Sequence, residues 1–177
     1  MALKPTIYKL GVTISDLNRN YYQTHHLTTA LHPSETQERM LARIMAFCLN
    51  ADEHLSFSRG LSAPDEPDIW SHSLDGVHQL SIDVGEPSVD RIKKATRVAR
   101  QVKVYSFNSK SDVWWSQSAR EFSALDATYY RFPWVQIQAL NALVARTMTL
   151  AVTISEDTAF ITADAGDFEL SWTQLQA

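Results

Sequence analysis

The chain has 177 residues, of which 45% are hydrophobic and 20% charged, a composition typical of one globular domain with a buried core. The formal net charge of −4 excludes a protein that attracts nucleic acid over its whole surface, so such binding would need a local basic patch. A single cysteine, Cys48, excludes an internal disulfide, and no apolar run is long enough to span a bilayer. Without a basic-then-apolar leader pattern, the sequence predicts one cytoplasmic domain over residues 1–177, with no membrane partner and an open oligomeric state.

The N-terminal third predicts a hairpin followed by a helix. Alternating apolar residues over 6–15 and 21–31, separated by turn chemistry, predict two strands. Ser34 and Gln37 form a capping-box pattern that opens a helix ending near Asn50. Glu38 lies at the N-terminal margin of the apolar stripe of this helix, so it either projects toward the sheet or complements the helix dipole in solvent.

The stretch 67–84 contains the two acidic residues on which the functional hypotheses depend. Asp75-Gly76 predicts a two-residue hairpin turn in which Leu74 pairs with Val77. That register places Asp68 directly opposite Asp83, with Cβ atoms roughly 5 Å apart. The alternative is a bulge or a longer loop that shifts the register and keeps the two acids apart.

Two opposed carboxylates destabilise a strand pair unless a proton or a cation compensates them. Their oxygen atoms suit Mg²⁺ or Mn²⁺, which one or two carboxylates hold together with water and phosphate. The sequence therefore predicts a divalent cation at Asp68 and Asp83. His72 and Gln79 alternate onto the same face and are candidate polar neighbours of this cation.

The segment 85–107 predicts a strand break, a helix over 89–99 and a parallel strand over 102–107, which makes a βαβ unit. On a helical wheel Lys93 lies beside the buried stripe and Lys94 on the far side, so Lys93 is expected to reach the strand end with Asp83. A basic run predicts either a solvated helix face or a surface that attracts phosphates. The run comprises Arg91, Lys93, Lys94, Arg97, Arg100 and Lys103.

The rest of the chain predicts a helix over 111–122, a strand over 126–131 and a helix over 133–144. Alternating residues from Met148 to Trp172 predict a three-stranded meander that extends the sheet of the N-terminal hairpin. The predicted fold class is therefore α/β, with strands and helices combined as in an α+β mixed sheet.

This order of elements resembles the core of the PD-(D/E)XK nuclease superfamily. Pro67-Asp68 matches its Pro-Asp element, and Asp83-Val84-Gly85 matches (D/E)-x-K without the lysine. Glu38 matches the acid that many members carry on the first helix. The resemblance implies that Glu38, Asp68 and Asp83 bind Mg²⁺ or Mn²⁺, and that Lys93 or Lys94 replaces the missing lysine from the following helix.

More narrowly, the whole chain resembles the YaeQ family. Five stretches carry the resemblance: Met1-Ala2-Leu3-Lys4, residues 32–40, Glu66-Pro67-Asp68, residues 82–85 and residues 91–95. The family implies a nuclease-like fold and a loose association with transcription elongation, but no settled activity.

Two functions follow as hypotheses. The first is a metal-dependent nuclease acting on DNA or RNA, with Glu38, Asp68, Asp83 and Lys93 as catalytic residues. Flanking phosphates would then bind Arg91, Lys94, Arg97 and Arg100. The second is a non-enzymatic module that binds protein or nucleic acid in a regulatory role, favoured by Gly85 and by the negative net charge.

Overall fold

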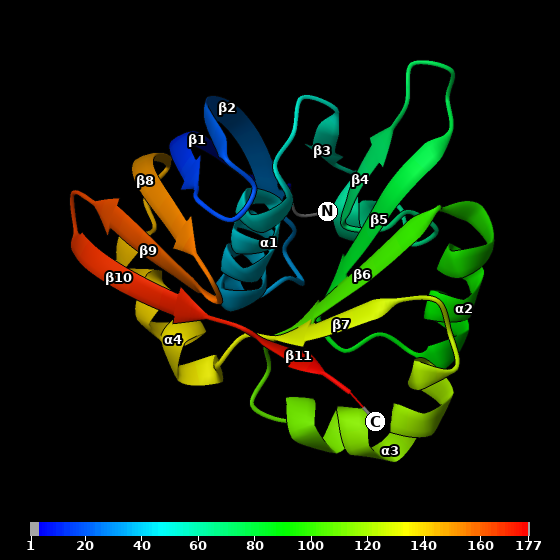
Figure 1. Cartoon of the computed structure of the whole chain (residues 1–177). Coiled ribbons are helices and arrows are strands. Elements are labelled where there is room, and N and C mark those ends of the chain that lie inside the picture. Colours follow the sequence, from blue (N-terminus) through cyan, green and yellow to red (C-terminus); the bar gives the residue numbers. More distant parts are fainter. Residues whose placement is uncertain (1–3, 177) are drawn as a thin grey trace.

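The computed structural model describes residues 4–176, and within them two mixed sheets and four α-helices form the fold (Figure 1). The first sheet has the order β10-β9-β8-β1-β2. Its strands are β1 (Thr6–Asp16), β2 (Tyr21–Leu31), β8 (Thr147–Ser155), β9 (Thr158–Ala163) and β10 (Gly166–Ser171). The N-terminal hairpin and the C-terminal meander thus share one sheet as predicted, joined by parallel pairing of β1 with β8.

The second sheet has the order β11-β7-β6-β5-β4-β3. Its strands are β3 (Leu55–Phe57), β4 (Ile69–His72), β5 (His78–Val84), β6 (Gln101–Ser106), β7 (Thr128–Arg131) and β11 (Thr173–Leu175). The predicted βαβ unit is confirmed, because β5 and β6 are parallel and flank α2 (Val89–Val98). The predicted meander was too long at its end, since the chain leaves the first sheet at Trp172 and adds β11 to the second.

The helix α1 (Gln37–Asn50) lies between the two sheets (Figure 1). It is buried almost all round, from Met40 to Cys48, because both sheets turn apolar faces toward it. On the other side of the second sheet, α2 and α3 (Ser111–Ser123) cover a smaller core built around Phe122. The last helix, α4 (Trp134–Ala139), is shorter than predicted and continues as a 3₁₀ turn over Leu140–Leu143.

The capping residue of α1 differs from the prediction. Thr36, not Ser34, is the N-cap, and its hydroxyl accepts from the Arg39 N–H at 3.2 Å. Ser34 instead contacts the His32 ring, and the Glu35 side chain is buried beneath two arginines. The capping box therefore predicted the helix but placed its start two residues early.

We expect Thr36→Ala to lower the free energy of unfolding by about 1 kcal/mol, the usual contribution of a hydroxyl N-cap. Ser34→Ala is the matched control, because exposed Ser34 caps no helical N–H. Urea denaturation of both variants measures the difference. Equal losses would show that Ser34 also caps the helix.

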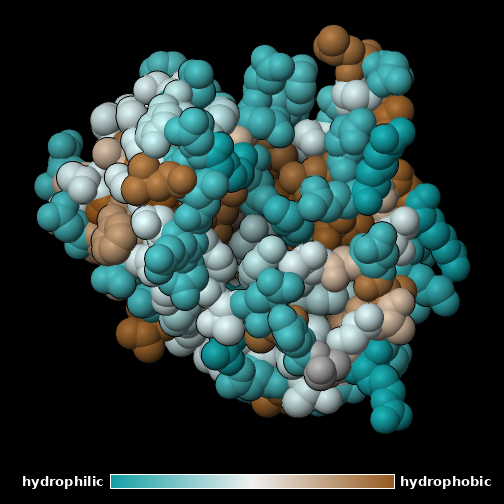
Figure 2. All heavy atoms as spheres, viewed as in Figure 1, coloured by the Kyte–Doolittle hydropathy of each residue, from teal (hydrophilic) through white to brown (hydrophobic). Residues whose placement is uncertain are grey.

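The β4–β5 hairpin reaches the predicted register by a different turn. Ser73 to Gly76 forms the β-turn, closed by the Gly76 N–H on the Ser73 carbonyl at 2.9 Å. Asp75 does not have the positive φ that a two-residue turn centred on Asp75-Gly76 would require, whereas Gly76 has φ +85°. The pair of Leu74 with Val77 is therefore wrong, and Leu74 lies at the hydrophobic hairpin tip visible in Figure 2, 95% exposed.

A β-bulge then restores the predicted alignment. His72 pairs with His78, but Ser71 pairs with Leu80 and Ile69 with Ile82, so Gln79 is the extra residue on β5. The one-residue difference at the turn is cancelled by this bulge. The predicted register is therefore present over Ile69–Ser71, and Asp68, directly before β4, donates its N–H to the Ile82 carbonyl at 3.0 Å.

Candidate functional site

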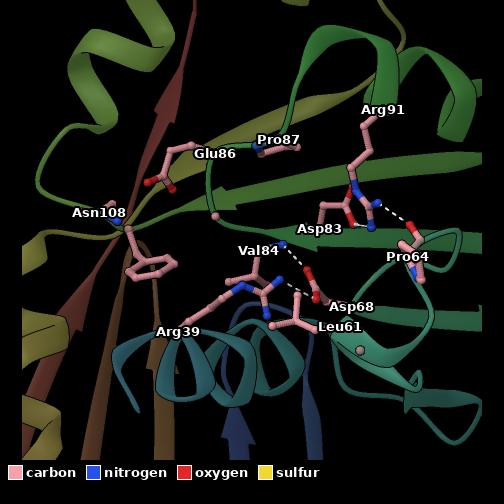
Figure 3. A pocket seen from close by; sticks show the side chains of 13 residues that line it. Arg39, Leu61, Pro64, Asp68, Asp83, Val84, Glu86, Pro87, Arg91 and Asn108 are labelled. Atoms are coloured by element: carbon pink, nitrogen blue, oxygen red, sulfur yellow. Dashed lines mark hydrogen bonds and ion pairs between the residues drawn. The ribbon is translucent and has the colours of Figure 1, made fainter. Parts of the chain in front are cut away.

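Asp68 and Asp83 lie together at the floor of an open hollow of about 400 Å³ beside the end of β5 (Figure 3). Asp68 directly precedes β4, and Asp83 is the penultimate residue of β5. Both are buried, with exposed fractions of 5% and 4%. In Figure 3 their carboxylates face the same space, between Arg39 from α1 and Arg91 from α2.

Asp68 is held by one charged and one backbone donor. Its Oδ1 accepts from Arg39 Nη2 at 2.7 Å, and its Oδ2 accepts from the Val84 N–H at 2.8 Å. Arg39 is itself held by Glu35, at 2.7 Å. The carboxylate is thus fixed across the hairpin by the backbone of the strand that carries Asp83.

Asp83 is held by Arg91 through both carboxylate oxygens, with Nε at 2.9 Å and Nη2 at 3.2 Å. Arg91 also donates to the carbonyls of Pro64 and Glu66, at 2.6 and 2.8 Å. It therefore ties the first turn of α2 to β5 and to the loop before β4.

The two guanidinium groups explain how the fold tolerates two opposed acids. Burial raises the pKa of Asp83, the Arg91 pair lowers it, and the charge of Asp68 raises it again. The net direction is upward, because desolvation is the largest cause. From the sequence we expected a proton or a metal ion to compensate the two acids. Compensation by two arginines was not predicted.

Glu86 is a third carboxyl group of the hollow that sequence reasoning missed. It points away from the two aspartates, toward Asn108 (Figure 3). Its Oε2 is buried without a hydrogen-bond partner among residues 4–176, and burial raises its pKa against the lowering effect of the Phe107 and Asn108 backbone N–H groups. The Gly85-Glu86-Pro87 sequence predicted the end of a strand. A carboxyl group at that strand end could have indicated that Glu86 lies near Asp83.

Glu38 does not join the two aspartates. Its Oε1 accepts from Asn141 Nδ2 at 3.3 Å, toward the 3₁₀ turn after α4, and it is not among the residues that line the hollow. The next residue of α1, Arg39, occupies the position expected for it. Across residues 4–176, no three His, Cys, Asp or Glu side chains converge to hold a metal ion, so the expected Glu38–Asp68–Asp83 ligand set is not assembled.

The helical wheel ranked the two lysines of α2 in the wrong order. Lys94 lines a second hollow of about 260 Å³ that also contains Asp83 and Arg91, whereas Lys93 does not line it. Both lysines are exposed, as are Arg97 and Arg100, so these four form part of a hydrophilic surface over α2 (Figure 2). Arg91 binds Asp83, and Lys94 follows it by three residues and therefore lies on the same face of α2.

Gly85 stands where the nuclease resemblance implies a lysine, and its backbone conformation favours glycine. Its φ of +118° is one that residues with a side chain rarely adopt, and its N–H donates to the Tyr105 carbonyl at 2.8 Å. A lysine here would be strained although open space surrounds its Cβ, whose nearest neighbour would be Phe107 at 4.0 Å. The strand therefore ends at a residue that cannot easily carry the motif side chain.

His72 belongs to an aromatic cluster instead of the acidic hollow. Its ring stacks on that of His78 at a centroid distance of 4.7 Å, and Trp70 packs edge-on against both. His78 Nε2 is buried without a partner in the described chain, and burial followed by the charge of His72 lowers the pKa of His78. His72 thus has an ordinary packing role in this structure.

Because the folded state lowers the pKa of His78, the unfolded chain binds more protons just below the ordinary value of about 6.5. Stability should therefore rise with pH up to about 6.5 and fall on acidification. We expect His78→Phe, which keeps an aromatic ring, to reduce the loss of stability between pH 7 and pH 5. Urea midpoints at the two pH values measure this, with His54→Phe as the exposed control. Equal pH dependence in wild type and His78→Phe would contradict it.

The comparison with known proteins identifies the family. A family model described as "YaeQ protein" matches residues 1–172. The chain belongs to the YaeQ family. Uncharacterized protein YaeQ from Escherichia coli (strain K12) is 40% identical over 180 residues, covering 99% of this chain and 98% of the relative. Residues 1–3, which contributed to the sequence resemblance, lie outside the described part of the structure.

Two solved YaeQ structures have the same mixed α+β fold. The YaeQ protein from Xanthomonas axonopodis pv. citri matches with a TM-score of 0.94 at 36% identity, covering 98% of this chain and 99% of that one. The YaeQ protein from Pseudomonas syringae matches with a TM-score of 0.92 at 33% identity, covering 98% and 97%. Among residues 4–176, every helix of this YaeQ-family chain is too short or too polar to cross a membrane.

Proposed function

We propose that this YaeQ-family protein is a metal-dependent phosphodiesterase acting on nucleic acid in the cytoplasm. The observation that carries the proposal is the placement of two buried carboxylates, Asp68 and Asp83, side by side in an open hollow that also contains two guanidinium groups. Carboxylate oxygens suit a hard divalent cation, and guanidinium groups suit phosphate.

The surrounding elements support a variant of the PD-(D/E)XK core. The antiparallel β4–β5 hairpin carries both acids, α2 follows β5 and returns the chain to parallel β6, and α1 packs on β5. These are the elements on which the sequence resemblance rests. Two positions depart from that core. Gly85 stands in place of the motif lysine, and Glu38 contacts Asn141 instead of the two aspartates.

The donor set fits Mg²⁺ or Mn²⁺ held by Asp68 and Asp83, since such ions need only one or two carboxylates plus water and phosphate oxygens. With Glu86 the hollow has three carboxyl groups against Arg39 and Arg91, a formal charge of −1. A divalent cation followed by one phosphodiester would bring that sum to zero. The ion would supply charge stabilisation at the phosphate and acidify a bound water.

Of the two arginines in the hollow, Arg39 is the better candidate to bind a phosphate. A guanidinium has five N–H donors. Two from Arg39 are used, toward Glu35 and Asp68, whereas Arg91 makes four hydrogen bonds. Arg39 therefore keeps three N–H groups without an acceptor in residues 4–176, and these would bind and orient a phosphate, while Arg91 mainly holds Asp83 in place.

The experiment that tests the proposal is cleavage of end-labelled single- and double-stranded DNA and RNA with Mn²⁺, Mg²⁺ or EDTA. We expect cleavage of at least one substrate that requires the metal and stops with EDTA. Failure to cleave any of the four substrates, under conditions where the folded protein binds the metal, would overturn it.

A second function is favoured by the two arginines. Because Arg39 and Arg91 compensate the acids, the fold can keep Asp68 and Asp83 together without any catalytic need. The hollow and the basic surface of α2 would then belong to a regulatory module that binds nucleic acid or protein. Oligonucleotide binding that is independent of metal and unaccompanied by cleavage would favour this function.

The two lysines of α2 give a prediction that depends on the geometry. Lys94 lines the second hollow, of about 260 Å³, together with Asp83, and Lys93 does not. We therefore expect Lys94→Ala to weaken substrate binding several-fold more than Lys93→Ala. Both residues are exposed, so both variants should fold equally well. Apparent KM values or oligonucleotide affinities at fixed salt measure the difference. A larger loss in Lys93→Ala would show that substrate follows the other face of α2.

A further inference from the structure

A further polar cavity, distinct from both hollows near Asp83, lies at the seam between the two sheets and shares no residue with the acidic hollow. Its volume is about 130 Å³. It forms where β1 and α1 end and the chain passes from the first sheet to the second through Trp172. Its polar lining includes Asp16, Arg19, Asn50, Lys103 and Tyr105.

Lys103 is a half-buried cation without a carboxylate partner in the described chain. Its Nζ donates to Asn50 Oδ1 at 2.7 Å, which leaves two of its three hydrogens without an acceptor among residues 4–176. Burial, and then the charge of Arg19, lowers the pKa of Lys103. Lys103 is the last residue of the basic run that begins at Arg91, but it lies on β6 and lines the cavity at the seam.

Asp16 is the acid that lines this cavity among the described residues, and both of its carboxylate oxygens already accept hydrogen bonds. Asp16 is 2% exposed, its Oδ2 accepts from Arg19 Nε at 2.7 Å, and its Oδ1 accepts from the backbone N–H groups of Asn18 and Arg19. Arg19 also donates through Nη1 to the Ala51 carbonyl at 2.9 Å, and its Cζ lies 5.0 Å from the centroid of the Tyr21 ring. Its Nη2 has no acceptor among residues 4–176. The formal charge of the lining is therefore +1, with the excess on Lys103.

Tyr105 adds a neutral donor. It is 3% exposed, and its hydroxyl accepts from Asn50 Nδ2 at 2.9 Å but donates to no acceptor in residues 4–176. Asn50 Nδ2 also donates to the Ala46 carbonyl at 2.8 Å, so the amide orientation is fixed. An ammonium, a guanidinium and a hydroxyl thus line one cavity, each with a hydrogen that meets no acceptor in the part of the chain that the structure describes.

We propose that the seam cavity binds a small oxyanion of the phosphate class, held by Lys103, Arg19 and the Tyr105 hydroxyl. Several unpaired donors around a net positive charge match an acceptor with several oxygens, and pairing with them would be charge-assisted. The volume is below the roughly 300–1,000 Å³ of pockets for drug-sized ligands, which favours inorganic phosphate or the end of a phosphate monoester over a whole nucleotide. The proposal is independent of any activity at Asp68 and Asp83.

The test is titration of the full chain with inorganic phosphate at constant ionic strength, with chloride as the reference anion. At phosphate ten times the Kd, we expect Tm to rise by about 3–6 °C. Lys103→Met should weaken phosphate binding at least tenfold, and Lys103→Arg should retain part of it. Lys9→Met, at an exposed position on β1, is the control and should bind as the wild type does.

Amine acylation gives a readout that does not depend on the stability of any variant. Phosphate should slow acylation of Lys103 in the wild type, measured by peptide mapping, without slowing that of Lys9. A non-saturating Tm effect, or equal phosphate affinity in wild type and Lys103→Met, would overturn the proposal. So would acylation of Lys103 at the same rate with and without phosphate.

Discussion

Replacement of Asp83 by asparagine is expected to reduce metal-dependent cleavage about 10²–10³-fold, the scale on which loss of one group from a preorganised charged site acts. Asn has nearly the same shape but no charge, so it loses the attraction for the cation. Arg91 would lose its ion pair, but its side chain is 37% exposed and keeps its bonds to Pro64 and Glu66. The variant should therefore stay folded, and single-turnover cleavage with Mn²⁺ measures the loss.

Asp167→Asn is the matched control, because Asp167 is an exposed acid on β10, in the other sheet. We expect it to retain nearly full activity. Stabilisation by Mn²⁺, followed as the rise in Tm, should disappear in Asp83→Asn and persist in Asp167→Asn. If Asp83→Asn cleaves and binds metal as the wild type does, the cation site is elsewhere.

Replacement of Glu35 by glutamine is expected to lower the free energy of unfolding by about 3–5 kcal/mol, as when one partner of a buried ion pair is removed. The Glu35 side chain is 2% exposed and accepts from Arg39 at 2.7 Å and from Arg43 at 2.8 Å. Arg43 is 4% exposed and continues the network into β2, to the Thr29 hydroxyl and the Ala30 carbonyl, both at 2.9 Å. Glutamine would turn an amide N–H toward guanidinium donors and leave buried positive charge unmatched.

Urea denaturation measures this loss, and Glu53→Gln is the control because the Glu53 side chain is 85% exposed. A loss below about 1 kcal/mol, the range of exposed pairs, would show that the network contributes little. Glu35 also positions Arg39 beside Asp68. Glu35→Gln should therefore weaken oligonucleotide binding at temperatures where the variant is still folded.

The outline of the fold was predictable because it is encoded in local patterns. Alternation marked both strands of the N-terminal hairpin, and the right-handed crossover rule gave the parallel pairing of β5 with β6. The predictions of element ends were wrong where neighbouring residues offer alternative turns or caps. The turn at Ser73–Gly76 and the N-cap at Thr36 each differ from a neighbouring pattern by only one or two residues.

The neighbourhood of the acids was harder to predict. Nothing in the spacing of Arg39 and Arg91 distinguishes a buried ion-pair partner from a solvated helical residue. The same holds for Glu38, because the rotation of α1 about its own axis decides whether residue 38 or residue 39 faces the second sheet. The packing of α1 between two sheets sets that rotation, and it exchanges an expected metal ligand for an arginine.

The sequence by itself determined the order of most elements, which follows from periodicity along the chain, and its motifs carried the resemblance to the YaeQ family. The register of Ile69–Ser71 with Leu80–Ile82 was also predicted, although the turn differs and a bulge compensates for it. Only the tertiary structure decided what surrounds the two acids and which lysine of α2 is near them. It also decided that Lys103 lies at the seam between the sheets. These outcomes depend on contacts between elements distant in sequence, where burial and charge compensation select among side chains that local patterns leave equivalent.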